Sequence, residues 1–142
     1  MVLKLYGTPR SPYVRLVAAI LLEKQVPFEL VVLDMSKSEQ KSLEYLSKQP
    51  FGQVPCIVWL PSRPLTSLES YFFLTRQDDD GFILYESRAI CYYIASKYAD
   101  QGPSLLPTGI KANALYQQAV FTEISHFNEH ALAAAREMLA KP

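Results

Sequence analysis

The segment from Val2 to Leu33 constrains the fold more than any other part of the chain, because strand-like and helix-like patterns alternate within it. Val2–Tyr6 is short and apolar, which is typical of a buried strand. Ser11 and Pro12 form a typical helix start, since a serine hydroxyl accepts from an orphan N–H and proline fits the first helical position. We expect this helix to end near Lys24 and a second strand to follow at Phe28–Leu33. The segment therefore predicts a right-handed parallel βαβ unit.

The next elements extend this unit into a larger sheet. Residues 36–39 (SKSE) have the pattern of a capping box and predict a short helix that ends near Ser47. A third strand is expected from Cys56, a fourth at 82–85, and a helix at 87–98. The order β-α-β-α-β-β-α predicts an α/β fold of the thioredoxin-like type.

Two segments depart from a simple version of this fold. Residues of about 58–77 separate the last two strands, where a hairpin loop is usually about two to five residues long. We interpret them as an inserted loop, one possible origin being an unremoved intron; without them, 78–81 (DDDG) would make a good turn. Residues 99–108 read as a linker, and 109–142 as part of an α-helical domain with one helix at 110–139.

Composition excludes several classes of protein. The chain has 142 residues, 49% hydrophobic and 20% charged, with a formal net charge of +0, which argues against disorder and against nucleic acid as a partner. No apolar run approaches the ~20 residues of a membrane-spanning helix, and Met1 leads directly into a strand, so we expect neither membrane insertion nor a leader segment. The two cysteines, without CxxC spacing, favour a reducing cytoplasmic location.

Three motifs carry a family resemblance: residues 7–11 (GTPRS), 49–55 (QPFGQVP) and 85–90 (YESRAI). In this order on this fold they resemble the amino-terminal domain of glutathione transferases, especially the phi-like class of plants and fungi. The resemblance implies a thioredoxin-like glutathione-binding domain at 1–98, a linker, and the first helix of an all-α second domain, so that the chain looks truncated in that domain.

Ser11 matches the family's catalytic serine. The enzyme must convert the glutathione thiol, whose reference pKa is about 8.5, into the nucleophilic thiolate. A hydroxyl that donates to sulfur at a helix N-terminus stabilises that charge. Ser11 and Pro12 would therefore contact glutathione, although Ser11 is also explained as a plain N-cap.

Two further segments are expected to hold the tripeptide. By resemblance, Gln53 would hold part of the peptide, Pro55 would be cis, and the backbone of Val54 would pair with the cysteinyl group as a short ladder. The hydroxyl and N–H groups at Ser87 would bind the γ-glutamyl carboxylate, with Glu86 near the amine. The plainer alternatives are a proline-ended loop and an acidic helix start.

Several other residues have a functional interpretation and a simpler structural one. Gln40 and Lys41 match the positions that hold the glycine carboxylate, although Gln40 replaces a common histidine and an exposed lysine is usually only solvated. Tyr6 is a nearby hydroxyl, but related classes use a tyrosine one residue later, where Gly7 stands, so Tyr6 is expected in packing. Phe51 is either the aromatic that inserts into a partner subunit or a loop residue packed over the sheet.

For the remaining reactive residues, we consider structural or solvated roles beside chemical ones. Cys56 begins a strand and Cys91 lies within a helix, where buried structural thiols are expected. Arg15 either tunes the field at Ser11 or is a solvated helix charge. His126 and His130 are four residues apart, but without a third ligand we predict no metal site.

The resemblance implies a glutathione transferase that adds the glutathione thiolate to electrophilic small molecules, acting as a homodimer with glutathione as co-substrate and no other cofactor. One alternative is a non-catalytic binding or regulatory module of the same fold, because the family's electrophile pocket lies in the second domain. The other is a thiol–disulfide reductase acting through Cys56. We also expect the uncovered apolar helix to promote association.

Overall fold

The computed structural model describes residues 2–60 and 81–140, and it divides the chain into two compact units, Met1–Ser104 and Leu105–Pro142. Each unit is described by itself. No helix of the described residues combines the length and the apolar character that crossing a membrane requires.

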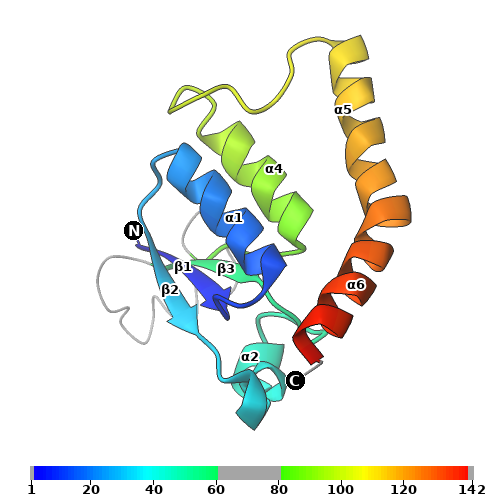
Figure 1. The fold of residues 1–142 in the computed structure, drawn as a ribbon. Coiled ribbons are helices and arrows are strands. Elements are labelled where there is room, and N and C mark those ends of the chain that lie inside the picture. Colours follow the sequence, from blue (N-terminus) through cyan, green and yellow to red (C-terminus); the bar gives the residue numbers. More distant parts are fainter. Residues whose placement is uncertain (1, 61–80, 141–142) are drawn as a thin grey trace. The chain divides into compact units, whose positions relative to one another are not determined.

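A four-stranded sheet forms the centre of the first unit, in the order β2-β1-β3-β4 (Figure 1). Its strands are β1 (Val2–Gly7), β2 (Phe28–Val32), β3 (Cys56–Leu60) and β4 (Ile83–Tyr85). Strands β1 and β2 are parallel, whereas β3 is antiparallel to both of its neighbours. The predicted βαβ unit and the thioredoxin-like arrangement are therefore confirmed.

Helices α1 (Pro12–Glu23) and α4 (Ser87–Lys97) lie side by side and cover one face of the sheet (Figure 1). Their apolar residues bury the main core together with alternate residues of β1 and β3. The fully buried members of this core include Leu5, Val17, Leu21, Ile57, Ile90 and Ile94. This core packs α1 and α4 against β1 and β3, so it fixes the positions of the two helix starts relative to the sheet.

The segment between β2 and β3 differs from the predicted single helix. It forms two 3₁₀ turns, Met35–Lys37 and Glu39–Lys41, followed by α2 (Leu43–Leu46). The capping-box prediction at 36–39 is wrong because Asp34 caps the first turn and Ser38 adopts a left-handed conformation with φ 57°. The Glu39 carboxylate accepts from the Asp34 N–H at 2.7 Å rather than from Ser36.

Strand β3 begins at Cys56, as expected, and continues to Leu60. Val58 pairs with Ile83 in the sheet, and the Trp59 carbonyl accepts a hydrogen bond from the Gly81 N–H at 2.9 Å. The proposed inserted loop otherwise falls on residues 61–80, which lie outside the described residues.

Residues 99–104, which the sequence assigns to a linker, belong to the first unit. The fully buried Lys24 at the end of α1 donates from Nζ to the Pro103 carbonyl at 2.7 Å. Gln101 donates to the Gln25 carbonyl at 2.9 Å, so two long-range hydrogen bonds hold this segment against the end of α1.

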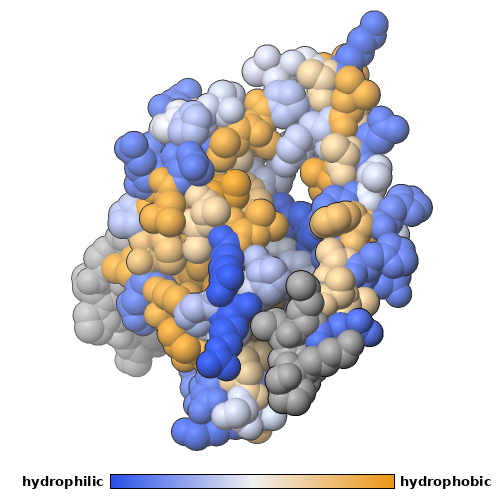
Figure 2. Space-filling model, viewed as in Figure 1, coloured by the Kyte–Doolittle hydropathy of each residue, from blue (hydrophilic) through white to orange (hydrophobic). Residues whose placement is uncertain are grey.

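The second unit is helical from Ile110 onward, but it is not one uniform α-helix. It consists of α5 (Ile110–Thr122), a π-helical turn (Glu123–Phe127) and α6 (Asn128–Ala140). Neither α5 nor the π turn contains a buried residue. Apolar side chains consequently reach the surface along this stretch, as the hydropathy colouring shows (Figure 2).

Candidate functional site

The sheet register places the three motif segments at one edge. Tyr6 is paired with Cys56, and Cys56 with Tyr85, so these residues form a line across β1, β3 and β4. Because β3 runs opposite to its neighbours, the next step beyond this line reaches the ends of β1 and β4 and the residue that precedes β3. These positions are Gly7, Pro55 and Glu86. Segments far apart in the sequence therefore meet at the edge where α1 and α4 begin.

Ser11 is the N-cap of α1, as the sequence predicts. Its backbone is extended, Pro12 follows at the first helical position, and its Oγ accepts from the Val14 N–H at 3.4 Å. The turn that leads from β1 to the helix is closed by the Ser11 N–H, which donates to the Thr8 carbonyl at 3.0 Å. Since Oγ acts as an acceptor in the cap, its own O–H remains able to donate to a ligand beside the positive end of the helix.

Gly7 stands where the end of β1 leaves no room for a side chain. A Cβ at position 7 would lie 2.4 Å from Cγ2 of Val14 and 3.4 Å from Cβ of Val54, so a side chain there would clash with the first turn of α1. Tyr6 points to the opposite face of the sheet, with its ring 6.2 Å from that of Tyr45. The expectation that Tyr6 lies in packing is confirmed.

The loop before β3 contains a cis peptide bond between Val54 and Pro55, as expected. Two residues that sequence reasoning missed hold the loop in place. The buried Gln49 accepts from the Gln53 N–H at 3.0 Å, and the Tyr45 hydroxyl donates to the Gln53 carbonyl at 2.7 Å. The side chain of Gln53 stays exposed, and the backbone of Val54 makes no hydrogen bond within 2–60 and 81–140. These groups are available to a peptide-like ligand.

The turn that carries Gln40 and Lys41 packs against this loop. The Lys41 ammonium donates to the Phe51 carbonyl at 2.8 Å, and a Cβ at Gly52, where φ is +58°, would lie 2.7 Å from the Gln40 carbonyl oxygen. Oε1 of Gln40 is buried and has no hydrogen-bond partner among the described residues. An unpaired buried acceptor costs free energy.

The start of α4 provides the third part of the edge. Glu86 is exposed and adopts φ 69°, a conformation that is uncommon for residues other than glycine. Ser87 is buried, and its Oγ accepts from Nη1 of Arg88 at 3.3 Å. The Arg88 guanidinium also lies 5.2 Å from the ring centroid of Tyr13, which joins the first turns of α1 and α4. The two helix starts thus lie close enough to act on one ligand.

The cysteines do not form a reactive thiol site. Burial raises the pKa of Cys56 to about 12 and that of Cys91 to about 11, from an ordinary value of 9.0. Both thiols are free, Cys56 being buried and Cys91 partly buried. The thiolate is the reactive form, so the predicted structural role of these cysteines fits the geometry and the reductase alternative does not.

Of the remaining candidates, Phe51 and Arg15 belong to the first unit, and the two histidines belong to the second. Phe51 is 59% exposed, and its ring packs edge-on against Tyr85 at 6.0 Å. Arg15 donates to the Pro9 carbonyl at 2.6 Å and so supports the turn before α1. His126 and His130 are both exposed, and no group of three or more potential ligands suited to a metal ion occurs in the described ranges.

Comparison with known proteins agrees with the family resemblance that the sequence motifs carry. The family described as "Glutathione S-transferase, N-terminal domain" matches residues 5–103. Glutathione S-transferase hmp2 of Hypomyces subiculosus is 39% identical over 99% of this chain and 57% of its own length. The crystal structure of poplar glutathione transferase F1 superposes with a TM-score of 0.78 at 38% identity, covering 100% of this chain and 57% of that one. A glutathione transferase homologue from Sulfitobacter, crystallised with bound glutathione, is 28% identical with a TM-score of 0.65 over 87% of this chain and 49% of its own.

The fold and this edge define a thioredoxin-like domain with a serine at the first helix start and a cis-proline loop beside it. The chain belongs to the glutathione S-transferase family, and its plant and fungal relatives place it with the phi-like class. It spans a little over half the length of the curated relatives that it matches.

Proposed function

We propose that this chain binds glutathione at the edge formed by Ser11, Val54 and Ser87 and transfers its thiolate to electrophilic small molecules. The observation that carries the proposal is the register, which aligns the ends of β1 and β4 with the start of β3. Ser11 would donate to the sulfur and stabilise the thiolate, supported by the N-terminal end of α1. Pro12 would shape this contact at the first helical position.

The other groups would hold the tripeptide. The free backbone of Val54 would pair with the cysteinyl amide, next to Pro55 and the exposed side chain of Gln53. The first N–H groups of α4 and the Ser87 hydroxyl would bind the γ-glutamyl carboxylate, with Glu86 near the amine. Gln40 and Lys41 would face the glycine carboxylate, an arrangement supported by their packing against the loop at Gly52.

Ser11→Ala is the direct test of this proposal. We expect turnover of 1-chloro-2,4-dinitrobenzene with glutathione to fall about 100-fold or more, because the thiolate loses its donor. Glutathione affinity, measured by isothermal titration calorimetry, should change much less, since most tripeptide contacts remain. Ser96→Ala removes an exposed hydroxyl from α4 and serves as the matched control, which should leave both measurements unchanged. Equal turnover in Ser11→Ala and the parent chain would refute the role of Ser11.

The same experiment separates conjugation from the non-catalytic alternative. Glutathione binding without measurable turnover in the parent chain would favour a binding module. We further propose a homodimer with Phe51 at its contact surface and a cytoplasmic location, supported by the exposure of Phe51 and by two free thiols. Sedimentation of the parent chain and of Phe51→Ala tests the dimer.

A further inference from the structure

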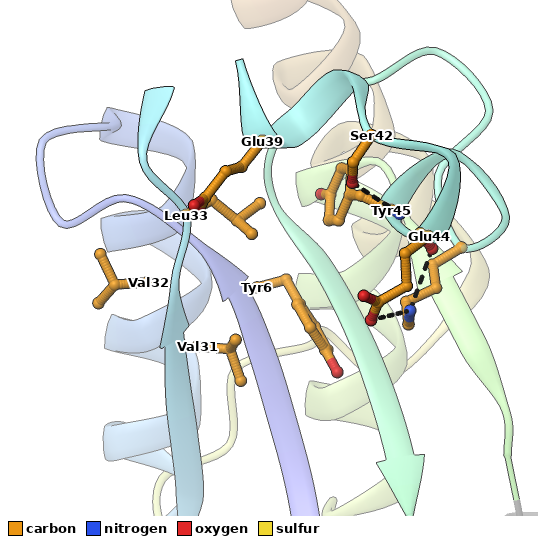
Figure 3. Close-up of a pocket in the computed structure, with 9 residues that line it drawn as sticks. Tyr6, Val31, Val32, Leu33, Glu39, Ser42, Glu44 and Tyr45 are labelled. Carbon is orange, nitrogen blue, oxygen red and sulfur yellow. Dashed lines mark hydrogen bonds and ion pairs between the residues drawn. The ribbon is translucent and has the colours of Figure 1, made fainter. Parts of the chain in front are cut away.

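Tyr45 is a buried tyrosine whose hydroxyl reaches the loop before β3. It lies in α2, and the Ser42 hydroxyl accepts from its backbone N–H at 3.2 Å (Figure 3). The residue is only 3% exposed and packs with Cys56 and Val58 of β3 in a second core cluster. The ring is therefore held against the sheet, so packing in the core determines where its hydroxyl lies.

The Tyr45 hydroxyl holds one particular carbonyl of this loop. It donates to the Gln53 carbonyl oxygen at 2.7 Å, and no other described group donates to that oxygen. The Gln53 N–H is held as well, because it donates to Oε1 of the buried Gln49 at 3.0 Å. Both main-chain polar groups of Gln53 are thus bonded to side chains rather than to other backbone groups. The conformation of the loop at this point depends on these two side chains.

The Gln53 carbonyl shares a rigid peptide plane with the Val54 N–H. This peptide bond is trans, so its C=O and its N–H point in opposite directions. The hydrogen bond that fixes the Gln53 oxygen consequently aims the Val54 N–H away from Tyr45. That N–H has no hydrogen-bond partner within residues 2–60 and 81–140, so it is able to donate to a ligand.

The same hydrogen bond also strengthens the Val54 N–H as a donor. A carbonyl that accepts a hydrogen bond polarises its peptide group, so that linked hydrogen bonds reinforce one another. Burial raises the pKa of Tyr45 above its ordinary value of 10.0, so the hydroxyl keeps its proton at neutral pH and remains a donor. A residue of the core thereby orients and strengthens a backbone donor on the proposed glutathione edge.

We propose that Tyr45 is a positioning residue for glutathione, which acts through the Gln53–Val54 peptide plane on a hydrogen bond from the Val54 N–H to the cysteinyl carbonyl. The inference rests on the proposed function, which sets the cysteinyl group of glutathione against the Val54 backbone. It assigns part of the affinity for the tripeptide to a hydroxyl outside the binding edge. A purely structural role for Tyr45 would instead change stability and leave the affinity of the folded chain unaltered.

Tyr45→Phe tests this role, because it removes the hydroxyl and keeps the ring that packs against β3. We expect the Kd for glutathione, measured by isothermal titration calorimetry, to rise about two- to tenfold, the range for loss of one hydrogen bond. In conjugation of 1-chloro-2,4-dinitrobenzene, the KM for glutathione should rise by a similar factor. The kcat at saturating glutathione should stay within about twofold of the parent value, since Ser11 is unchanged.

Tyr98→Phe is the matched control. Tyr98 is a partly buried residue at the C-terminal end of α4, and its hydroxyl makes no hydrogen bond to a described residue. This variant should keep the Kd and the KM of the parent chain. Thermal denaturation of both variants controls for folding. An equal rise in Kd for the two variants would overturn the proposal.

γ-Glutamylcysteamine isolates the Val54 contact, because it keeps the thiol and the neighbouring N–H of glutathione but lacks the cysteinyl carbonyl. Its Kd should be the same for the parent chain and for Tyr45→Phe, and a loss as large as that for glutathione would contradict the proposal. In ¹H–¹⁵N NMR of the parent chain, the Val54 amide proton should move to lower field with glutathione and much less with the analogue. Equal shifts would overturn the proposal without reliance on any variant.

Failure of this inference and failure of the proposed function give different results. A parent chain that does not bind glutathione would refute the proposed function and, with it, the role of Tyr45. Glutathione binding with the same Kd in the parent chain and in Tyr45→Phe would refute the role of Tyr45 alone and leave the proposed function standing.

Discussion

The two compact units of the chain differ in what their apolar residues do. The core of the first unit buries Leu3 and Leu5 of β1 together with one face of α1 and one face of α4. In α5 and the π turn of the second unit, Leu115, Phe121 and Phe127 are all more than 60% exposed. Both units have apolar residues at helical spacing, so the spacing alone does not secure burial.

This difference shows that a sheet gives an amphipathic helix a surface that a lone helical stretch does not have. Helices α1 and α4 bury their apolar faces against β1 and β3 and against each other. Burial of one large aliphatic side chain contributes about 1.5–3 kcal/mol, which the exposed apolar side chains of α5 and the π turn do not gain within the described residues. The following predictions test this comparison, beginning with the largest effect.

Leu21→Ala should be the most damaging of the substitutions considered, because Leu21 is fully buried in the core of the first unit. Its loss should lower the free energy of unfolding by about 2–5 kcal/mol in urea denaturation. Phe121→Ala removes a larger side chain from α5, but this residue is 63% exposed, so the change should stay within about 0.5 kcal/mol. A similar loss in both variants would show that the second unit has a core of its own.

Two glycines with positive φ offer a second contrast. A Cβ at Gly102, where φ is +65°, would lie 2.3 Å from the Glu23 carbonyl oxygen, whereas a Cβ at Gly109, where φ is +93°, would meet nothing within 4 Å. Both alanine variants bear backbone strain, but only Gly102→Ala adds a backbone clash that costs roughly 1–3 kcal/mol. Thermal denaturation should therefore show the lower midpoint for Gly102→Ala. A lower midpoint for Gly109→Ala than for Gly102→Ala would contradict this prediction.

Alkaline pH should weaken the first unit gradually. Burial raises the pKa of Cys56 to about 12 and that of Cys91 to about 11 from 9.0, so the folded chain keeps protons that the unfolded chain releases. Their contribution is fully present below pH 9.0 and is lost as the pH rises through these raised values. The slope should approach about 1.4 kcal/mol per pH unit for each thiol. Urea denaturation of the parent and of Cys56→Ala at alkaline pH measures it, and identical slopes would contradict the prediction for Cys56.

Local chemistry was sufficient to predict much of the first unit. The strand at Val2, the Ser11–Pro12 helix start and the helix from Ser87 are encoded by short patterns of apolar and capping residues, and the structure contains all three. The pattern at 36–39 failed because Asp34 accepts from both N–H groups of the expected capping box, from Ser36 through its carboxylate and from Glu39 through its carbonyl. A capping pattern predicts that a side chain accepts from the first N–H groups of a helix, but it does not determine which of several neighbouring acceptors does so.

The supports of the candidate site could not be predicted in this way. Gln49 and Tyr45 hold the backbone of Gln53 through hydrogen bonds that depend on how the loop folds back. The burial of Lys24 depends on Pro103, far along the chain. Nothing in the local sequence distinguishes these side chains from exposed ones, because their partners are brought to them only by the tertiary fold.

The alignment of Gly7, Pro55 and Glu86 across three strands makes the proposed glutathione edge depend on assembly of the whole sheet. No short peptide from this chain would contain all three positions, so the proposed glutathione edge exists only in the folded sheet. A tripeptide bound there at 100 times its dissociation constant would add about 2.7 kcal/mol to stability by mass action. Glutathione would then stabilise the folded domain in addition to serving as its co-substrate.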